Sequence, residues 1–225
     1  MNKMTENTEE RKILAAAFDM DGTLLDSMPR WREINVQFAR DLGVNPTPEQ
    51  EKEMIQCSGT MLISYFKQVF GIERGYDALA AKAHERMEHV YREGVPVKKN
   101  VESYLQSLHD RGILCVLATA TPVRLTTIAL NRSGLMKYFD YVFTADLMGC
   151  SKARPEFFEK MCREINCRAE QCEFYDDAYY ALETAYHLGI RTVGMHDCTN
   201  EWDWEHMSEV THEKRWEFQA SYPGK

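Results

Sequence analysis

Five short apolar runs in the chain do not alternate with polar residues. They cover residues 13–18, 113–118, 141–144, 172–175 and 190–195, and stretches with helical periodicity lie between them. Continuous apolar runs are typical of strands buried on both faces, as in a parallel sheet. Strands that alternate with helices predict right-handed βαβ units. We therefore predict an α/β fold whose core is a Rossmann-like open parallel sheet.

Helices that follow these strands are predicted from their period and from the residues at their ends. The expected helices cover residues 101–110, 121–133, 155–165 and 178–188. Thr121 followed by Pro122 is typical of an N-cap and a first helical position. Gly134 and Gly189 stand where a helix would stop, because glycine adopts the left-handed conformation that ends many helices.

One connection is much longer than the others. Residues 19–112 separate the first run from the second, whereas a crossover between parallel strands needs only about a dozen residues. Most of this connection has helical periodicity, with Trp31, Ile34 and Phe38 on one face. We expect residues 28–97 to form an inserted helical cap, and residues 1–27 and 98–225 to form the α/β core. The cap would lie over the C-terminal end of the first strand.

The charge balance argues against a nucleic-acid partner. The net charge is −8, no basic stripe is present, and the longest basic cluster, Lys98-Lys99, is expected to be solvated. No apolar run is long enough to span a membrane, and residues 1–12 lack the apolar region of a secretory signal. We expect a protein with neither a nucleic-acid nor a membrane partner. The sequence carries no signal for a particular oligomeric state.

The cysteines favour a reducing compartment. There are seven of them, an odd number, at irregular spacings and without a Cys-x-x-Cys pair. Reduced thiols in a cytoplasmic protein account for this pattern. The five-residue spacing of Cys162, Cys167 and Cys172 matches no usual zinc site.

Two acids follow the first strand directly. A tight turn explains Asp21-Gly22, but it does not explain Asp19, which ends a buried apolar run. A carboxylate at such a place is costly to desolvate without a partner. A divalent cation would supply that partner, and oxygen ligands suit Mg²⁺.

Further polar residues stand at the ends of other strands. Thr119 ends the second strand, Lys152 follows the third, and Asp176-Asp177 ends the fourth. The carboxyl ends of parallel strands meet at the sheet edge where ligands bind. Acids that hold a metal, together with a lysine that neutralises a transferred phosphoryl group, predict a magnesium-dependent phosphoryl-transfer site.

These motifs resemble those of the haloacid dehalogenase superfamily. The segment 18–27, with the letters FDMDGTLLDS, resembles the first motif of that family almost letter for letter. Thr119 stands where the second motif has its hydroxyl residue, Lys152 where the third has its lysine, and Asp176-Asp177 resembles the two-acid form of the fourth. The motif order and the helical insert are similar to the branch that includes phosphoglycolate phosphatases and beta-phosphoglucomutases.

The resemblance implies a role for each reacting residue. Asp19 would attack phosphorus and form an aspartyl-phosphate, and Asp21 would act as general acid and base. Lys152 would pair with Asp19 and the phosphate, and Thr119 would hydrogen-bond the phosphoryl oxygens.

The resemblance also implies a metal site and substrate contacts. Mg²⁺ would be held by Asp19, the backbone carbonyl of Asp21 and Asp177, with Asp176 behind these ligands or linked to the metal through water. Ala120 follows Thr119 where many relatives carry asparagine and would lie against the substrate. Gly59 belongs either to a cap loop that reaches the substrate or to an ordinary turn between helices.

A phosphatase acting on a small-molecule phosphate ester is the function we predict. A phosphomutase of the beta-phosphoglucomutase type is the alternative, although residues 56–66 contain no Lys or Arg to grip a second phosphate. Dehalogenation is disfavoured by Asp21, which dehalogenases of this superfamily lack. A non-catalytic phosphate-binding protein is disfavoured because every reacting position is intact.

Overall fold

The computed structural model describes residues 12–56, 60–73, 76–201 and 203–223. Its centre is a six-stranded sheet in the order β3-β2-β1-β4-β5-β6, and every neighbouring pair is parallel. The strands are β1 Ala15–Phe18, β2 Leu114–Thr119, β3 Tyr141–Thr144, β4 Cys172–Asp176, β5 Arg191–Met195 and β6 Glu213–Arg215. The open parallel α/β core is confirmed. The sequence did not predict β6, whose three residues are all charged.

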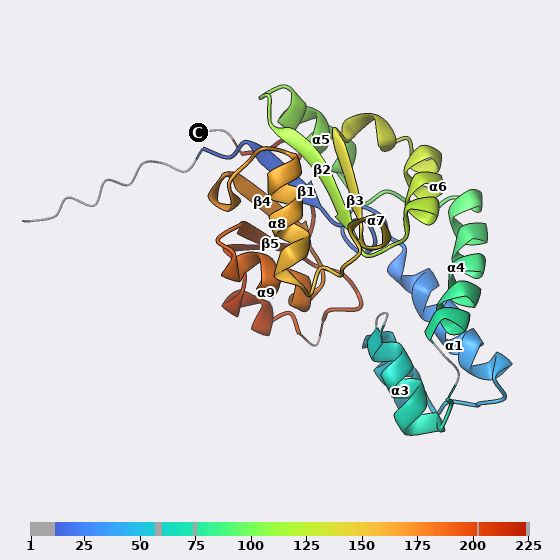
Figure 1. The fold of residues 1–225 in the computed structure, drawn as a ribbon. Coiled ribbons are helices and arrows are strands. Elements are labelled where there is room, and N and C mark those ends of the chain that lie inside the picture. The colour runs from blue at the N-terminus through green and yellow to red at the C-terminus, as the bar shows by residue number, and fades with distance from the viewer. Residues whose placement is uncertain (1–11, 57–59, 74–75, 202, 224–225) are drawn as a thin grey trace, which may run out of the picture.

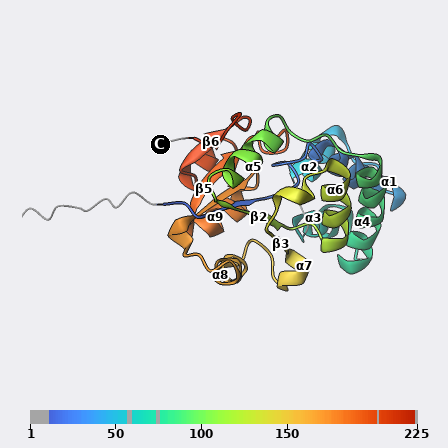
Figure 2. The same ribbon diagram turned by 90° about the horizontal axis from the view of Figure 1, so that it is seen from above.

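Helices cover both faces of the sheet (Figures 1 and 2). The core helices are α5 Val101–His109, α6 Val123–Ser133, α7 Ala145–Met148, α8 Pro155–Glu164 and α9 Tyr179–His187. Three short 3₁₀ helices, Met136–Tyr138, Ala169–Gln171 and His206–Glu209, complete the core. The four longer helices lie where the sequence predicted them. The helix α6 begins one residue later than predicted, with Pro122 rather than Thr121 at its N-cap.

The side chains of β1 divide between two hydrophobic layers. Ala16 and Phe18 belong to the layer beneath α5, where Phe18 stacks on Tyr175 with ring centroids 4.6 Å apart. Ala15 and Ala17 belong to the opposite layer, together with the aromatic side chains of α8. Each large side chain that is fully buried contributes about 1.5–3 kcal/mol. The carboxyl end of β1 is therefore held on a well-packed platform.

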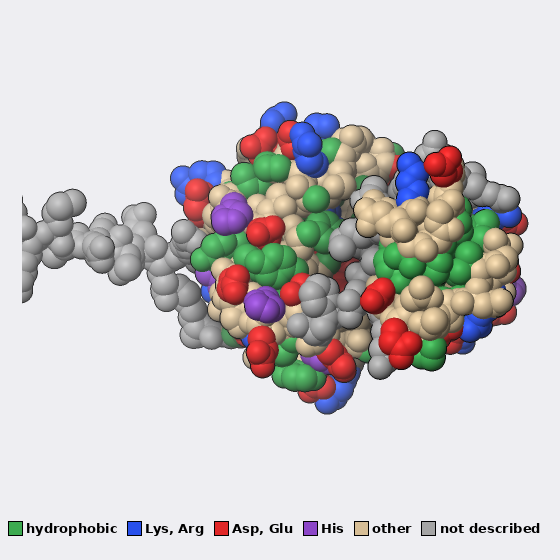
Figure 3. Space-filling model, turned by 90° about the horizontal axis from the view of Figure 1, so that it is seen from below, with side chains coloured by type: hydrophobic (Ala, Val, Ile, Leu, Met, Phe, Trp, Pro, Cys, Tyr) green, Lys and Arg blue, Asp and Glu red, His purple; other side chains and the backbone are tan. Residues whose placement is uncertain are grey.

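The long connection is a helical insertion, as predicted. It contains α1 Met28–Asp41, α2 Pro48–Gln56, α3 Thr60–Phe70 and α4 Tyr76–Glu93. Ile34 of α1 and Met87 of α4 pack into the layer that contains Phe18, while Phe38 and Phe66 form part of a separate small cluster. In Figure 3 the insertion forms a lobe beside the core, with hydrophobic side chains gathered on the face in view.

The chain enters and leaves the insertion along two adjacent segments. Leu25 and Val97 form an antiparallel bridge, and the Lys98 amide donates to the Leu24 carbonyl at 2.9 Å. We propose on this basis that the cap comprises residues 28–97. No helix within the described residues has the length and apolarity that crossing a membrane would require.

Candidate active site

Three carboxylates meet at the carboxyl ends of two neighbouring strands. Asp19 follows β1, Asp176 ends β4, and Asp177 follows it. Because β1 and β4 are parallel neighbours, their carboxyl ends reach the same sheet edge. One oxygen from each carboxylate lies within 4.8 Å of the others, and all three residues are buried. Strand order reverses at this point, which is where open α/β sheets bind ligands.

A single buried lysine forms ion pairs with two of these carboxylates. The Lys152 Nζ lies 2.5 Å from Asp19 Oδ1 and 2.6 Å from Asp176 Oδ2. Asp176 also accepts the Ala178 amide at 2.7 Å, at the start of α9. Asp177 contacts no cation in the described structure, and its carboxylate accepts a long hydrogen bond of 3.4 Å from Thr23. The three acids therefore carry more negative charge than Lys152 neutralises.

The surroundings of these acids disfavour their charged forms. Burial raises the pKa of Asp19 to about 7, with Lys152 opposing the shift and Asp176 adding to it. Burial, followed by the charges of Asp176 and Asp19, raises the pKa of Asp177 well above its usual range. Burial works to lower the pKa of Lys152, but the charges of Asp176 and Asp19 outweigh it and raise that pKa.

The donor set fits a divalent cation. It offers only carboxylate oxygens, which Mg²⁺ prefers to nitrogen or sulfur. A cation bound beside Asp177 would offset the desolvation cost of these buried carboxylates, which is high when they have no positively charged partner. The buried cluster is consistent with a divalent metal site.

The metal-free protein should lose stability as pH rises through this cluster's titration. The folded protein keeps a proton on Asp19 up to about pH 7, whereas a carboxyl with the ordinary pKa of 3.8 releases it earlier. The folded state therefore binds more protons between these values, and this contribution to the free energy of unfolding falls as pH rises. Urea unfolding in EDTA should show the decline, and saturating Mg²⁺ should remove it. Asp19→Asn should flatten the decline, and an equal slope in that variant would contradict this account.

Gly22 allows the first loop to approach Asp177. Its φ is +83°, and a Cβ built on it would lie 2.3 Å from Asp177 Oδ2. Gly134 offers a matched control, because its φ is +74° but no atom lies within 4 Å of an added Cβ. Both alanine variants should bear left-handed strain of about 1–2 kcal/mol. Only Gly22→Ala should also displace Asp177, so calorimetry should find Mg²⁺ binding lost in that variant alone. Equal Mg²⁺ affinity in the two variants would show that the contact is unimportant.

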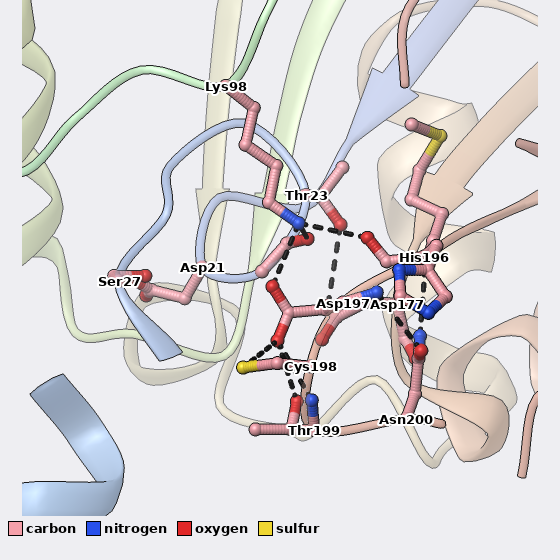
Figure 4. A network of polar contacts seen from close by, with 12 residues as sticks. Asp21, Thr23, Ser27, Lys98, Asp177, His196, Asp197, Cys198, Thr199 and Asn200 are labelled. Atoms are coloured by element: carbon pink, nitrogen blue, oxygen red, sulfur yellow. Dashed lines mark hydrogen bonds and ion pairs between the residues drawn. The ribbon is translucent and has the colours of Figure 1, made fainter. Parts of the chain in front are cut away.

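Asp21 lies apart from the acidic cluster. Its Oδ1 accepts hydrogen bonds from Ser27 Oγ at 2.6 Å and Tyr91 OH at 2.5 Å, and its Oδ2 accepts one from Thr121 Oγ1 at 2.7 Å. Figure 4 shows Asp21 beside Ser27, pointing away from Asp177. Burial and the charge of Asp21 raise the pKa of Tyr91 well above its usual range, so this tyrosine remains a donor. The prediction that Thr121 caps α6 was wrong, because its hydroxyl binds Asp21.

The other predicted site residues lie at different places. Thr119 is buried at the end of β2, where its Oγ1 accepts the Thr121 amide at 3.2 Å. Ala120 is exposed beside it. Gly59 lies outside the described residues. Their roles at the phosphate and the substrate stay predictions.

Lys98 and its partners were not predicted as part of the site. The Lys98 Nζ donates to the Gly22 carbonyl, to the His196 carbonyl at 3.0 Å and to Asp197 Oδ2 at 2.8 Å (Figure 4). The expectation that Lys98 is solvated was wrong, since its side chain is only 18% exposed. Asn200 Nδ2 donates to the backbone carbonyl of Asp177 at 2.9 Å. These contacts tie the first loop and the fourth motif to the loop that follows β5.

A parallel α/β sheet that gathers buried carboxylates and a lysine at its carboxyl edge is typical of phosphoryl-transfer enzymes. Residues 16–195 match the model of the haloacid dehalogenase-like hydrolases. The chain belongs to this family, as its motifs predicted.

Individual relatives are distant and cover most of the chain. A phosphorylated carbohydrates phosphatase of Thermotoga maritima is 25% identical over 179 residues, which is 80% of this chain and 83% of the relative. Hexitol phosphatase B of Escherichia coli is 26% identical over 187 residues, covering 81% and 83%. The crystal structure of CbbY from Rhodobacter sphaeroides in complex with phosphate superposes with a TM-score of 0.76 at 19% identity, covering 91% of this chain and 94% of that protein. This last likeness concerns the fold.

Proposed function

We propose that this protein is a magnesium-dependent phosphatase that hydrolyses a small phosphorylated metabolite through an aspartyl-phosphate on Asp19. The observation that carries the proposal is the convergence of Asp19, Asp176, Asp177 and Lys152 at one buried sheet edge. Nothing in a tight turn or an ordinary core requires three buried acids at one sheet edge, two of them paired with the same lysine. A phosphoryl group needs that combination of a nucleophilic oxygen and nearby positive charge.

Each of the following site residues has a role in the proposed reaction. Asp19 attacks phosphorus and carries the phosphoryl group, while Lys152 offsets the charge on Asp19 and on the phosphoryl oxygens. Asp21 transfers a proton to the leaving oxygen and later takes one from the attacking water. Bound Mg²⁺, held by Asp19, the Asp21 carbonyl and Asp177, would neutralise the phosphoryl charge. Asp176 keeps Lys152 in place through its own ion pair.

We propose phosphorylated sugars and sugar alcohols as the first substrates to test. This choice rests on relatives whose names refer to phosphorylated carbohydrates, hexitols and phosphoglycolate. We also propose a cytoplasmic location, which the free thiols of the described cysteines support.

The test is phosphate release from a panel of such esters with and without Mg²⁺. We expect turnover that EDTA abolishes and added Mg²⁺ restores. Chromatography of the products separates hydrolysis from isomerisation of the sugar phosphate, and so distinguishes a phosphatase from the phosphomutase alternative. A purified, folded protein that stays inactive across the whole panel with Mg²⁺ would overturn the proposal.

A further inference from the structure

Three hydroxyl groups from three parts of the chain surround the Asp21 carboxylate. Ser27 precedes α1, and Thr121 lies in the loop between β2 and α6. Tyr91 comes from the last turn of α4, 70 residues along the chain from Asp21. The carboxylate therefore has donors on both oxygens, and one of them reaches it from the cap. Hydrogen bonds of this kind to a charged acceptor are short and comparatively strong.

Tyr91 is held so that its hydroxyl hydrogen points at Asp21. The side chain is only 1% exposed and packs in the layer that contains Phe18. Trp31 is a partly buried side chain that packs against the same layer. Because an ionised carboxylate only accepts hydrogen bonds, the tyrosine hydroxyl donates its own hydrogen to Asp21.

The helix that carries Tyr91 is fixed to the core as well as to α1 of the cap, with which it shares the ion pair between Arg86 and Asp41. Met87, one turn earlier, is fully buried in the same core layer. Glu88 forms an ion pair of 2.6 Å with Arg124 of α6, which ties the two helices together. Figure 1 shows α4 next to α6 of the core and alongside α1 of the cap. The position of the Tyr91 hydroxyl is thus set by the packing of α4 on the core.

We infer that Tyr91 is a positioning residue for Asp21, supplied by the cap to the acid and base of the core. The inference rests on the proposed function, in which Asp21 transfers the proton. Without the tyrosine hydroxyl, Asp21 keeps Ser27 on one oxygen and Thr121 on the other, and its carboxyl group is less firmly oriented. Proton transfer to the leaving oxygen depends on that orientation, because a general acid must lie within hydrogen-bond reach of the atom it protonates.

The leaving group provides a readout that a merely structural role would not move. A hexitol phosphate leaves as a poor alkoxide and needs a proton, whereas p-nitrophenyl phosphate leaves as a stable phenolate and hardly needs one. In Tyr91→Phe, kcat/KM for the hexitol phosphate should fall about tenfold, a part of the 10²–10⁴ that a general acid supplies. For the aryl ester it should change less than about twofold. The ratio of the two values in one preparation does not depend on the folded fraction.

Tyr104→Phe is the matched control, because Tyr104 is also buried and its hydroxyl binds Tyr175 and Arg215 in the core. In Tyr104→Phe, the ratio of kcat/KM for the hexitol phosphate to kcat/KM for p-nitrophenyl phosphate should equal that of the wild type. In an Asp21→Asn background, Tyr91→Phe should have no further effect on either ester. The inference would be overturned if Tyr91→Phe left the ratio of the two kcat/KM values unchanged. It would also be overturned if Tyr91→Phe lowered kcat/KM for the hexitol phosphate as much in the Asp21→Asn background as in the wild type. A wild type that hydrolyses neither ester would instead count against the proposed function.

Discussion

Asp19→Asn is expected to lower kcat by at least about 10³-fold, because an amide cannot attack phosphorus and the reaction loses its nucleophile. The substitution keeps the size of the side chain and removes one charge from the cluster of three buried acids. Without metal, this variant should therefore be at least as stable as the wild type. Steady-state kinetics with Mg²⁺ and urea unfolding in EDTA measure the two effects on the same preparation.

An exposed acid controls for the loss of a charge alone. Asp110 lies at the end of α5, and Asp110→Asn should retain the activity and stability of the wild type. If Asp19→Asn kept more than a tenth of the wild-type kcat, Asp19 would not be the nucleophile. If it unfolded in EDTA at lower urea than the wild type, the cluster would not carry the excess charge that we describe.

Lys152→Met should remove both activity and stability. Lys152 is 2% exposed and is the cation that pairs with Asp19 and Asp176. Breaking a buried ion pair on one side leaves an uncompensated charge, which costs about 3–5 kcal/mol. The loss in EDTA should grow as pH rises, because burial raises the pKa values of Asp19 and Asp177 and these acids become charged only as pH increases, with no metal to offset them. Urea unfolding and phosphate release measure the two losses.

Two further variants separate the charge effect from the chemistry. Lys160→Met removes a lysine that is exposed and binds only the Met148 carbonyl among its described contacts, so it should behave as the wild type. The double variant Lys152→Met/Asp176→Asn restores the charge balance and should regain stability without activity. A single Lys152→Met variant as stable as the wild type in EDTA would contradict the proposed electrostatics.

The sequence predicted the parts of the fold that depend on local pattern. Five buried strands were recognisable because their apolar runs do not alternate. The positions of Asp19, Lys152 and Asp177 followed from strand ends that must share one edge. The strand β6 gave no such signal, because its three residues are all charged and form no apolar run.

The residues that sequence reasoning missed act over long separations in the chain. Lys98 was read as half of a solvated pair, because no local pattern indicates that it crosses to Gly22 and Asp197. Tyr91 lies on a helix whose period predicts core packing and says nothing of its hydroxyl. Thr121 beside Pro122 matched a helix N-cap, yet Asp21 competes for the same oxygen and binds it. Such contacts depend on how the cap docks onto the core.

Trapping the phosphorylated form of Asp19 shows whether the phosphoryl group is transferred to that residue. The enzyme would be quenched in acid during turnover with Mg²⁺, treated with borohydride, digested and examined by mass spectrometry. Borohydride reduces an acyl phosphate to an alcohol, so Asp19 should be converted to homoserine only when substrate is present. Turnover without any modified aspartate, or modification at Asp21 in place of Asp19, would contradict the account.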